Sequence, residues 1–276
     1  MEPIKILIPT DFSVQADFAF SLVQNLSSTL PMEIHFLHIL NVPESVVLKE
    51  NQLIDFCGEL DIKFMDNLRI IAARKLAMLE EAHQGVKTHL ILGKTTQSII
   101  DFAEKQKFDL IVMGTKGATG IREKLAGSET QHIARKSPIP VLSLMCDRSE
   151  LKIKNILFVH NFEDTAKQDL GILQTLLTKF QPTLHFLQIT KGKSEVELNR
   201  IENNMCDFSR ANALPNFEAH IIQDKDVEQG VIHFNQMHEI DLVCMGTHGK
   251  GSIFHASVTE KLINHLYKPM ISFIIK

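Results

Sequence analysis

The sequence predicts an α/β protein built from two similar halves, each a five-stranded parallel sheet that is doubly wound, with helices on both faces. Two observations predict this fold. Short apolar segments rich in β-branched residues alternate with longer segments of helical periodicity, as in sheets covered on both sides. In addition, four segments of the first half recur in the same order in the second half, which indicates an internal repeat.

The repeat sets the expected domain boundaries. KILIPTDF at residues 5–12 resembles NILFVHNF at 155–162, and IHFLHI at 34–39 resembles LHFLQI at 184–189, both offset by 150 residues. DLIVMGTKG at 109–117 resembles DLVCMGTHG at 241–249, and SPIPVLSL at 137–144 resembles LYKPMISF at 266–273. The third pair is offset by 132 residues and the fourth by 129. The second copy therefore lacks 18 residues in its middle and three more in its glycine loop. We expect two domains, residues 1–147 and 152–276, divided at the charged segment DRSELK.

The elements of the first half follow from local pattern. Strands are expected at residues 4–9, 33–40, 87–92, 110–113 and 141–145. Helices are expected from a cap at residues 11–13 to about residue 28, over 50–83 with a break near Gly58, over 95–105, and over 127–136. The second half repeats this order, with a shorter helix over 195–213 replacing the long one.

Composition narrows the class of protein. The formal net charge of −4 provides no basic field for nucleic acid. No signal-peptide pattern opens the chain, and no apolar run of about 18 residues appears. The four cysteines are far apart and form no C-x-x-C motif, which favours free thiols in a reducing compartment. We expect a soluble cytoplasmic protein with no membrane or nucleic-acid partner.

The segment MGTKGATGIREKLAGSE, residues 113–129, is the first candidate for a binding loop. Ligands of doubly wound sheets bind outside the carboxyl ends of the strands, where this loop lies. Glycines let backbone N–H groups approach an anion, and Gly127 and Ser128 fall at the start of a helix, where a phosphate is favoured. Asp11 ends the first strand and could accept hydrogen bonds from a base or ribose. In the alternative interpretation, the glycines only make tight turns and Asp11 only caps a helix.

These residues resemble a known family. The spacing G-x2-G-x9-G-[ST] after an apolar strand ending in Met is typical of ATP-binding universal stress proteins, and residues 114–128 match it in full. The opening KILIPTDFS, the strand IHFLHI and the closing PIPVLSL are also similar to that family. The resemblance covers nearly the whole chain, twice, so the chain resembles a tandem universal stress protein with the Rossmann-like fold of adenine-nucleotide alpha hydrolases.

The resemblance implies a pose for ATP in the first domain. Asp11, with Pro9 and Thr10 before it, would bind the adenine edge, Ile39 would line the base and Met113 would lie beside the ribose. The ribose and phosphates would be wrapped, largely through backbone atoms, by Gly114, Gly117, Gly127, Ser128 and Glu129. Glu129 departs from the family, which usually has an apolar residue there. A carboxylate pointing inward would repel phosphate, and Lys116, Arg122, Lys124 or Mg²⁺ could offset it.

The second copy has lost parts of this motif. Asn161 takes the place of Asp11, and Ala256-Ser257 replaces Gly127-Ser128 in a loop three residues shorter. An alanine where a positive φ is needed would be costly, so we expect little or no ATP binding there. The resemblance implies instead that the second domain is a built-in partner. Residues 141–145 and 270–275 would pair antiparallel and hide two sheet edges, and a homodimer is a further option.

No metal site and no catalytic residue is expected. His35 and His38 are three apart on a strand, so they face opposite sides of the sheet, and His248 and His255 have no evident third ligand. Ser128 lacks recognisable triad partners, and the chain has neither a P-loop nor a G-x-G-x-x-G motif. Slow ATP hydrolysis is the most activity we would expect, since no general base can be identified.

Two functions therefore stay open. The first is a stress-response regulator that binds ATP in its first domain. The second is a universal stress protein that binds no nucleotide and acts as an interaction scaffold. A third, an adenylate-forming ligase or nucleotidyltransferase, is disfavoured because the first strand ends in PTDFS rather than in the S-G-G-x-D-S of such enzymes.

Overall fold

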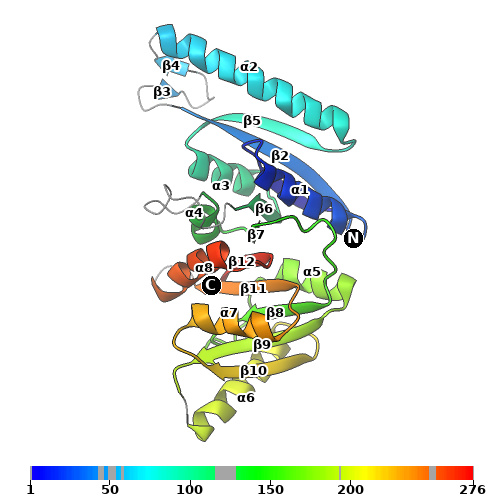
Figure 1. The fold of residues 1–276 in the computed structure, drawn as a ribbon, viewed down its shortest axis with the longest axis vertical. Coiled ribbons are helices and arrows are strands. Elements are labelled where there is room, and N and C mark those ends of the chain that lie inside the picture. Colours follow the sequence, from blue (N-terminus) through cyan, green and yellow to red (C-terminus); the bar gives the residue numbers. More distant parts are fainter. Residues whose placement is uncertain are drawn as a thin grey trace.

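A computed structural model describes residues 2–42, 47–48, 54–56, 59–115, 129–192, 194–248 and 253–275. Within these residues the fold is a ten-stranded sheet flanked by helices on both faces, together with a small two-stranded sheet (Figure 1). The first half contains β1 (Ile4–Pro9), α1 (Val14–Ser27), β2 (Met32–Asn41), β3 (Val47–Leu48), β4 (Ile54–Phe56), α2 (Glu59–Ala82), β5 (Lys87–Gly93), α3 (Thr95–Lys105), β6 (Leu110–Gly114), α4 (Glu129–Lys136) and β7 (Val141–Leu144). The second half contains β8 (Asn155–Val159), α5 (Gly171–Phe180), β9 (Thr183–Thr190), α6 (Glu195–Ala211), β10 (Phe217–Gln223), α7 (Val227–Met237), β11 (Leu242–His248), α8 (Ile253–His265) and β12 (Met270–Ile275).

The two halves have the same strand order. The sheet runs β10-β9-β8-β11-β12-β7-β6-β1-β2-β5, so each half reads fifth, fourth, first, second and third strand outward from the centre. Within each half the neighbouring strands are parallel. The order reverses between β1 and β6, and again between β8 and β11. These are the two switch points at which such sheets bind ligands.

The halves join through their last strands, as predicted. β7 and β12 run antiparallel, pairing Val141 with Ser272, Leu142 with Ile271 and Ser143 with Met270. Next to this seam α4 packs on α8, where Gln131 Nε2 donates to the carbonyl oxygen of Glu260 and the Arg135 guanidinium lies 3.3 Å from the Glu260 carboxylate. Strands that would be sheet edges in a separate half are therefore covered by each other.

Successive residues of a strand point to opposite faces of the sheet and pack into two apolar layers, one on each face. In β1, Ile4, Ile6 and Ile8 pack toward α1, while Leu7 packs toward α3 and α4. The first layer continues through α5 and α6 of the second half, and the second layer continues through α7 and α8. Buried strands with apolar residues on both faces are expected for a parallel sheet with two helical covers.

One part of the predicted secondary structure was wrong. Residues 50–83 were expected to be helical throughout, with one break near Gly58. The structure instead places β4 (Ile54–Phe56) antiparallel to β3 (Val47–Leu48), and the helix α2 begins at Glu59. The alternation of apolar and polar residues in a three-residue strand is too short to be separated from helical periodicity.

A pair of histidines spans two neighbouring strands in each half. His35 Nδ1 lies 2.8 Å from His89 Nε2 between β2 and β5, and His185 Nδ1 lies 3.1 Å from His220 Nε2 between β9 and β10. Burial lowers the pKa of all four imidazoles below the usual histidine range. Close to the first pair, hydrogen bonds from Lys87 and His35 lower the pKa of Glu33 to about 2.

These histidines make stability depend on pH. An imidazole held neutral in the fold takes up its proton more readily in the unfolded chain, so the free energy of unfolding should fall as pH drops below about 6.5. One proton bound only by the unfolded chain gives a slope of about 1.4 kcal/mol per pH unit. Urea titrations between pH 7.5 and pH 5 measure this slope, and the double variant His89→Gln, His220→Gln should make it shallower. Equal slopes for both proteins would contradict the assignment.

Candidate functional site

The turn after β1 presents the first predicted site residues at the carboxyl edge of the sheet. Thr10 is buried, its N–H donates to the Leu37 carbonyl oxygen at 2.9 Å, and its hydroxyl oxygen accepts from the N–H of Phe12. Asp11 is exposed, and its Oδ1 accepts from the N–H of Ser13 at 3.0 Å. Phe12 has φ of 62°, a left-handed conformation that is uncommon outside glycine. Side-chain acceptors thus hold a strained turn that projects Asp11 from the sheet edge.

Gly114 ends β6 beside this turn. A Cβ atom there would lie 2.0 Å from the carbonyl oxygen of Gln15, so α1 packs with its first turn directly on the end of β6. β1 and β6 pair Ile6 with Leu110 and Leu7 with Ile111, and continuing this register places Thr10 level with Gly114. The absence of a side chain at Gly114 therefore lets the Asp11 turn and the start of the glycine loop meet at the switch point.

The amino terminus of α4 closes the same region. Thr130 Oγ1 donates to the Gly114 carbonyl oxygen at 3.1 Å, which ties α4 to the end of β6. Glu129 is the first residue of α4, and its exposed carboxylate accepts a hydrogen bond from the Thr96 hydroxyl on α3. Its position could repel a phosphate, but the carboxylate is engaged with the first turn of α3.

The remaining predicted residues divide into two groups. Ile39 and Met113 are 9% and 7% exposed and belong to the apolar layer beneath α3 and α4, and Pro9 is buried at the end of β1. Gly117, Gly127 and Ser128 lie outside the described residues. The structure thus places Gly114 next to both the Asp11 turn and the first turn of α4, while Ile39 and Met113 lie in the apolar layer.

Thr115, which follows Gly114, is a further candidate residue at this edge that has no recognisable motif in the sequence. Its N–H donates to the Leu144 carbonyl oxygen at 2.7 Å, and its hydroxyl oxygen is buried with no hydrogen-bond partner among the residues that the structure describes. A buried polar group without a partner is costly, so the region beside Gly114 can accept a polar ligand atom.

The equivalent region of the second half is built differently. His160 replaces Thr10, and its Nδ1 accepts from the N–H of Phe162, which is fully buried among aromatic rings. α8 begins at Ile253, so Ala256 lies inside a helix. The expected cost of a positive φ at Ala256 was therefore wrong, because Ala256 lies within α8. Gly246 is buried at the corresponding position of β11, whereas Gly249 lies outside the described residues.

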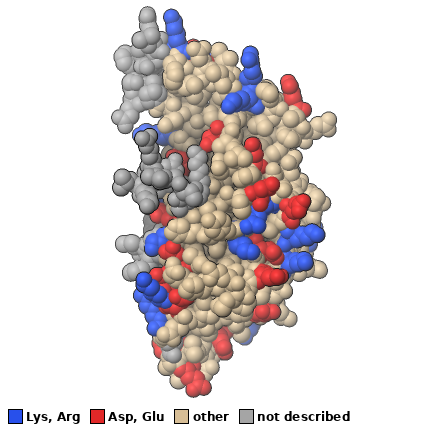
Figure 2. All heavy atoms as spheres, in the orientation of Figure 1, with Lys and Arg blue, Asp and Glu red and all other residues tan. Residues whose placement is uncertain are grey.

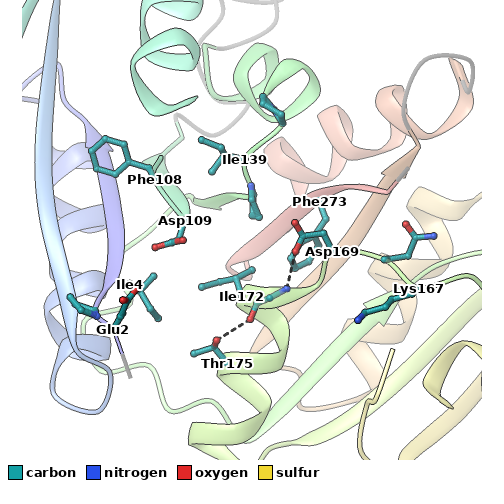
Figure 3. A pocket seen from close by; sticks show the side chains of 15 residues that line it. Glu2, Ile4, Phe108, Asp109, Ile139, Lys167, Asp169, Ile172, Thr175 and Phe273 are labelled. Atoms are coloured by element: carbon teal, nitrogen blue, oxygen red, sulfur yellow. Dashed lines mark hydrogen bonds between the residues drawn. The ribbon is translucent and has the colours of Figure 1, made fainter. Parts of the chain in front are cut away.

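A pocket of about 630 Å³ lies elsewhere, between the two halves (Figure 3). In that view Ile4 and Asp109 of the first half lie opposite Ile172 of α5. None of the predicted site residues lines it. Two of its carboxylates accept backbone hydrogen bonds. Asp109 accepts from the N–H of Lys5 and Asp169 from the N–H of Gly171, so both stabilise the local backbone.

Charge does not collect at one place on the visible face. Figure 2 shows Lys and Arg side chains interspersed with Asp and Glu side chains. No helix in the described part of the chain is both long enough and apolar enough to span a bilayer. Among the described cysteines, Cys146, Cys206 and Cys244 are free thiols, and complete burial raises the pKa of Cys244 well above its usual range.

The strand order and the two switch points define a doubly wound α/β protein with a Rossmann-like fold. Comparison with known proteins identifies the family. The sequence profile of the Universal stress protein family matches residues 4–144, half of the chain, so the chain belongs to this family.

Individual relatives agree with this assignment. Over 149 residues the chain is 30% identical to universal stress protein MJ0577 of Methanocaldococcus jannaschii, covering 50% of this chain and 92% of that protein. It is 31% identical over 146 residues to universal stress protein MJ0531 of the same organism, covering 53% and 84%. The crystal structure of a universal stress protein from Archaeoglobus fulgidus superposes with a TM-score of 0.69 at 19% identity, over 98% of this chain and 96% of that one.

Replacing Gly114 with alanine should destabilise the protein. The new methyl group has no room against the Gln15 backbone, and overpacking of this kind costs about 1–3 kcal/mol or more. Gly171→Ala is the matched control, because its Cβ would meet nothing closer than 3.6 Å. Urea denaturation should show a clear loss for the first variant and little change for the second. Similar effects of both variants would contradict close packing at Gly114.

Proposed function

We propose that the chain is a stress-response regulator that binds ATP in its first domain, residues 1–147. The second domain, residues 152–276, is a permanent partner that covers the sheet edge of the first. The observation that carries this proposal is the meeting of the Asp11 turn, Gly114 and the first turn of α4 at the switch point of the half that matches the family.

The described residues fit an adenine nucleotide in several respects. The exposed Asp11 carboxylate can accept from an amino or hydroxyl group, and the buried Thr115 hydroxyl has bonding capacity to offer. The first turn of α4 supplies N–H groups and the positive end of a helix dipole, which favour a phosphate. The loop sequence G-x2-G-x9-G-S supports the same ligand, and Mg²⁺ could accompany it to offset the charge of Glu129.

The differences between the halves support a single site. Asn161 replaces the Asp11 carboxylate, and helix α8 includes the Ala256-Ser257 step that replaces Gly127-Ser128. The second domain therefore contributes structure through β12 and α8 rather than a second nucleotide.

A scaffold that binds no nucleotide is the second candidate. Glu129 favours it, because its carboxylate occupies the first turn of α4. Exposed apolar residues on α2, Phe64, Ile70, Ile71 and Met78, offer a surface for protein contacts. Nucleotide binding separates the two candidates.

Calorimetric titration of nucleotide-free protein with ATP should give one site per chain. Asp11→Ala should weaken binding by about tenfold or more, because a hydrogen bond to a charged acceptor contributes about 1.5–3 kcal/mol. Gly127→Ala should abolish it. Asn161→Ala, the matched change in the second half, should leave the affinity unchanged.

Two results would count against this assignment. If titration with millimolar ATP gives no binding heat, the chain does not bind ATP, and the scaffold that binds no nucleotide becomes the favoured function. Two nucleotides per chain, or equal losses from Asp11→Ala and Asn161→Ala, would show that the second half also binds.

A further inference from the structure

Three metal-ligating side chains converge on the edge of the second half. His185 lies on β9, and Glu218 and His220 lie on the neighbouring edge strand β10. The register pairs Glu218 directly with His185, and His220 is two residues further on, so all three side chains share the sheet face covered by α7. His185 lies 33 and 35 positions before Glu218 and His220 in the sequence, so the three residues form no local motif.

The ligand atoms form a compact triangle. His185 Nδ1 lies 3.1 Å from His220 Nε2 and 3.3 Å from the Glu218 carboxylate, and His220 Nε2 lies 3.8 Å from that carboxylate. Four-coordinate tetrahedral zinc with bonds of about 2.0–2.2 Å requires ligand atoms roughly 3.3–3.6 Å apart. The observed separations therefore need shifts of only a few tenths of an ångström to surround one ion.

We propose that His185, Glu218 and His220 bind a divalent transition-metal ion of the zinc type. Imidazole is a ligand of intermediate softness and carboxylate is a hard ligand. A set of two imidazoles and one carboxylate therefore suits zinc better than calcium or magnesium. Three protein ligands leave the fourth tetrahedral position for water.

A hydrogen bond to Asn155 fixes the orientation and tautomer of the His185 imidazole. Its Nε2–H donates to Asn155 Oδ1 at 3.4 Å, so Nδ1 carries the lone pair that faces His220 and Glu218. Asn155 is itself held at the start of β8, where its N–H donates to the Asp241 carboxylate at 2.9 Å. The ring of His220 packs edge-on against Phe234 of α7, with ring centres 4.8 Å apart.

The site combines a buried side with an open side. The His185 side chain is 9% exposed, that of His220 is 20% exposed and that of Glu218 is 61% exposed. An ion can therefore enter over Glu218 from solvent, while the two imidazoles are held by the sheet and α7. His238, exposed at the end of α7, has its ring centre 5.5 Å from that of His220.

The first half contains the same histidine pair without the carboxylate in place. His35 and His89 meet through the same ring atoms as His185 and His220. Lys87 stands opposite His35, where Glu218 stands opposite His185. The carboxylate of Glu33 is bonded to His35 Nε2 and to Lys87, so it takes the role of Asn155 rather than that of a ligand. A lysine cation at the ligand position disfavours a metal ion between His35 and His89.

Titration of the untagged, metal-free full chain with zinc chloride tests the site. Calorimetry should give one zinc ion per chain, and Co²⁺ should produce the visible absorption of a four-coordinate site. Glu218→Gln and His220→Gln should each weaken zinc binding by more than about tenfold. Removing only a residue that hydrogen-bonds to a ligand already costs about that much, and these two changes remove a ligand itself. His89→Gln, the matched change in the first half, should leave affinity and stoichiometry unchanged.

A gain of binding tests the comparison between the halves. Lys87→Glu restores a carboxylate opposite His35 and should raise the stoichiometry from one zinc ion per chain to two. Circular dichroism and urea unfolding of the metal-free variants establish that each is folded. The proposal is overturned if no zinc binds at 100-fold excess over protein. It is overturned equally if Glu218→Gln and His220→Gln bind as tightly as the parent, or if His89→Gln causes the same loss as His220→Gln.

Discussion

The antiparallel pairing of β7 with β12 is the contact on which the rest of the architecture depends. Each half alone would end in an exposed, apolar parallel strand, and such edges recruit other chains. The seam buries both strands, aligns the two sheets into one, and brings α4 against α8. It also reverses strand direction, so the carboxyl edge of the first half and the amino edge of the second lie on the same side of the sheet.

The two halves share the same backbone architecture but differ in a few polar side chains. Strand order, the left-handed turn at Phe12 and Phe162, and the histidine pair occur in both. Single replacements at equivalent places then separate the halves. Asp11 is matched by Asn161 at one edge, and Lys87 is matched by Glu218 between the outer strands. Covalent linkage makes this division possible, because every chain contains one copy of each half.

Much of the fold could be predicted from local sequence, and less of the site. The bounds of β1 and α3 were predicted to the residue. A short apolar run determines the strand, and a clear helical period determines the helix. β4 was missed because three residues carry no distinguishable period. The cluster of His185, Glu218 and His220 was missed because it depends on the register between β9 and β10, which sequence spacing does not specify. Histidines at matching positions of both repeats were the available signal.

The reversed strand direction places the two proposed sites on one edge of one sheet. The turn at Asp11 ends β1, and the histidine cluster lies near the amino ends of β9 and β10. Six strand spacings separate β1 from β9, a distance of roughly 30 Å. Over that distance direct electrostatic interaction between a nucleotide and a metal ion is screened by salt. The covalent chain apart, the two halves are connected at the seam, where Arg135 of α4 lies 3.3 Å from Glu260 of α8. Since α4 also begins at the proposed nucleotide site, its packing on α8 ties the position of that helix terminus to the second half.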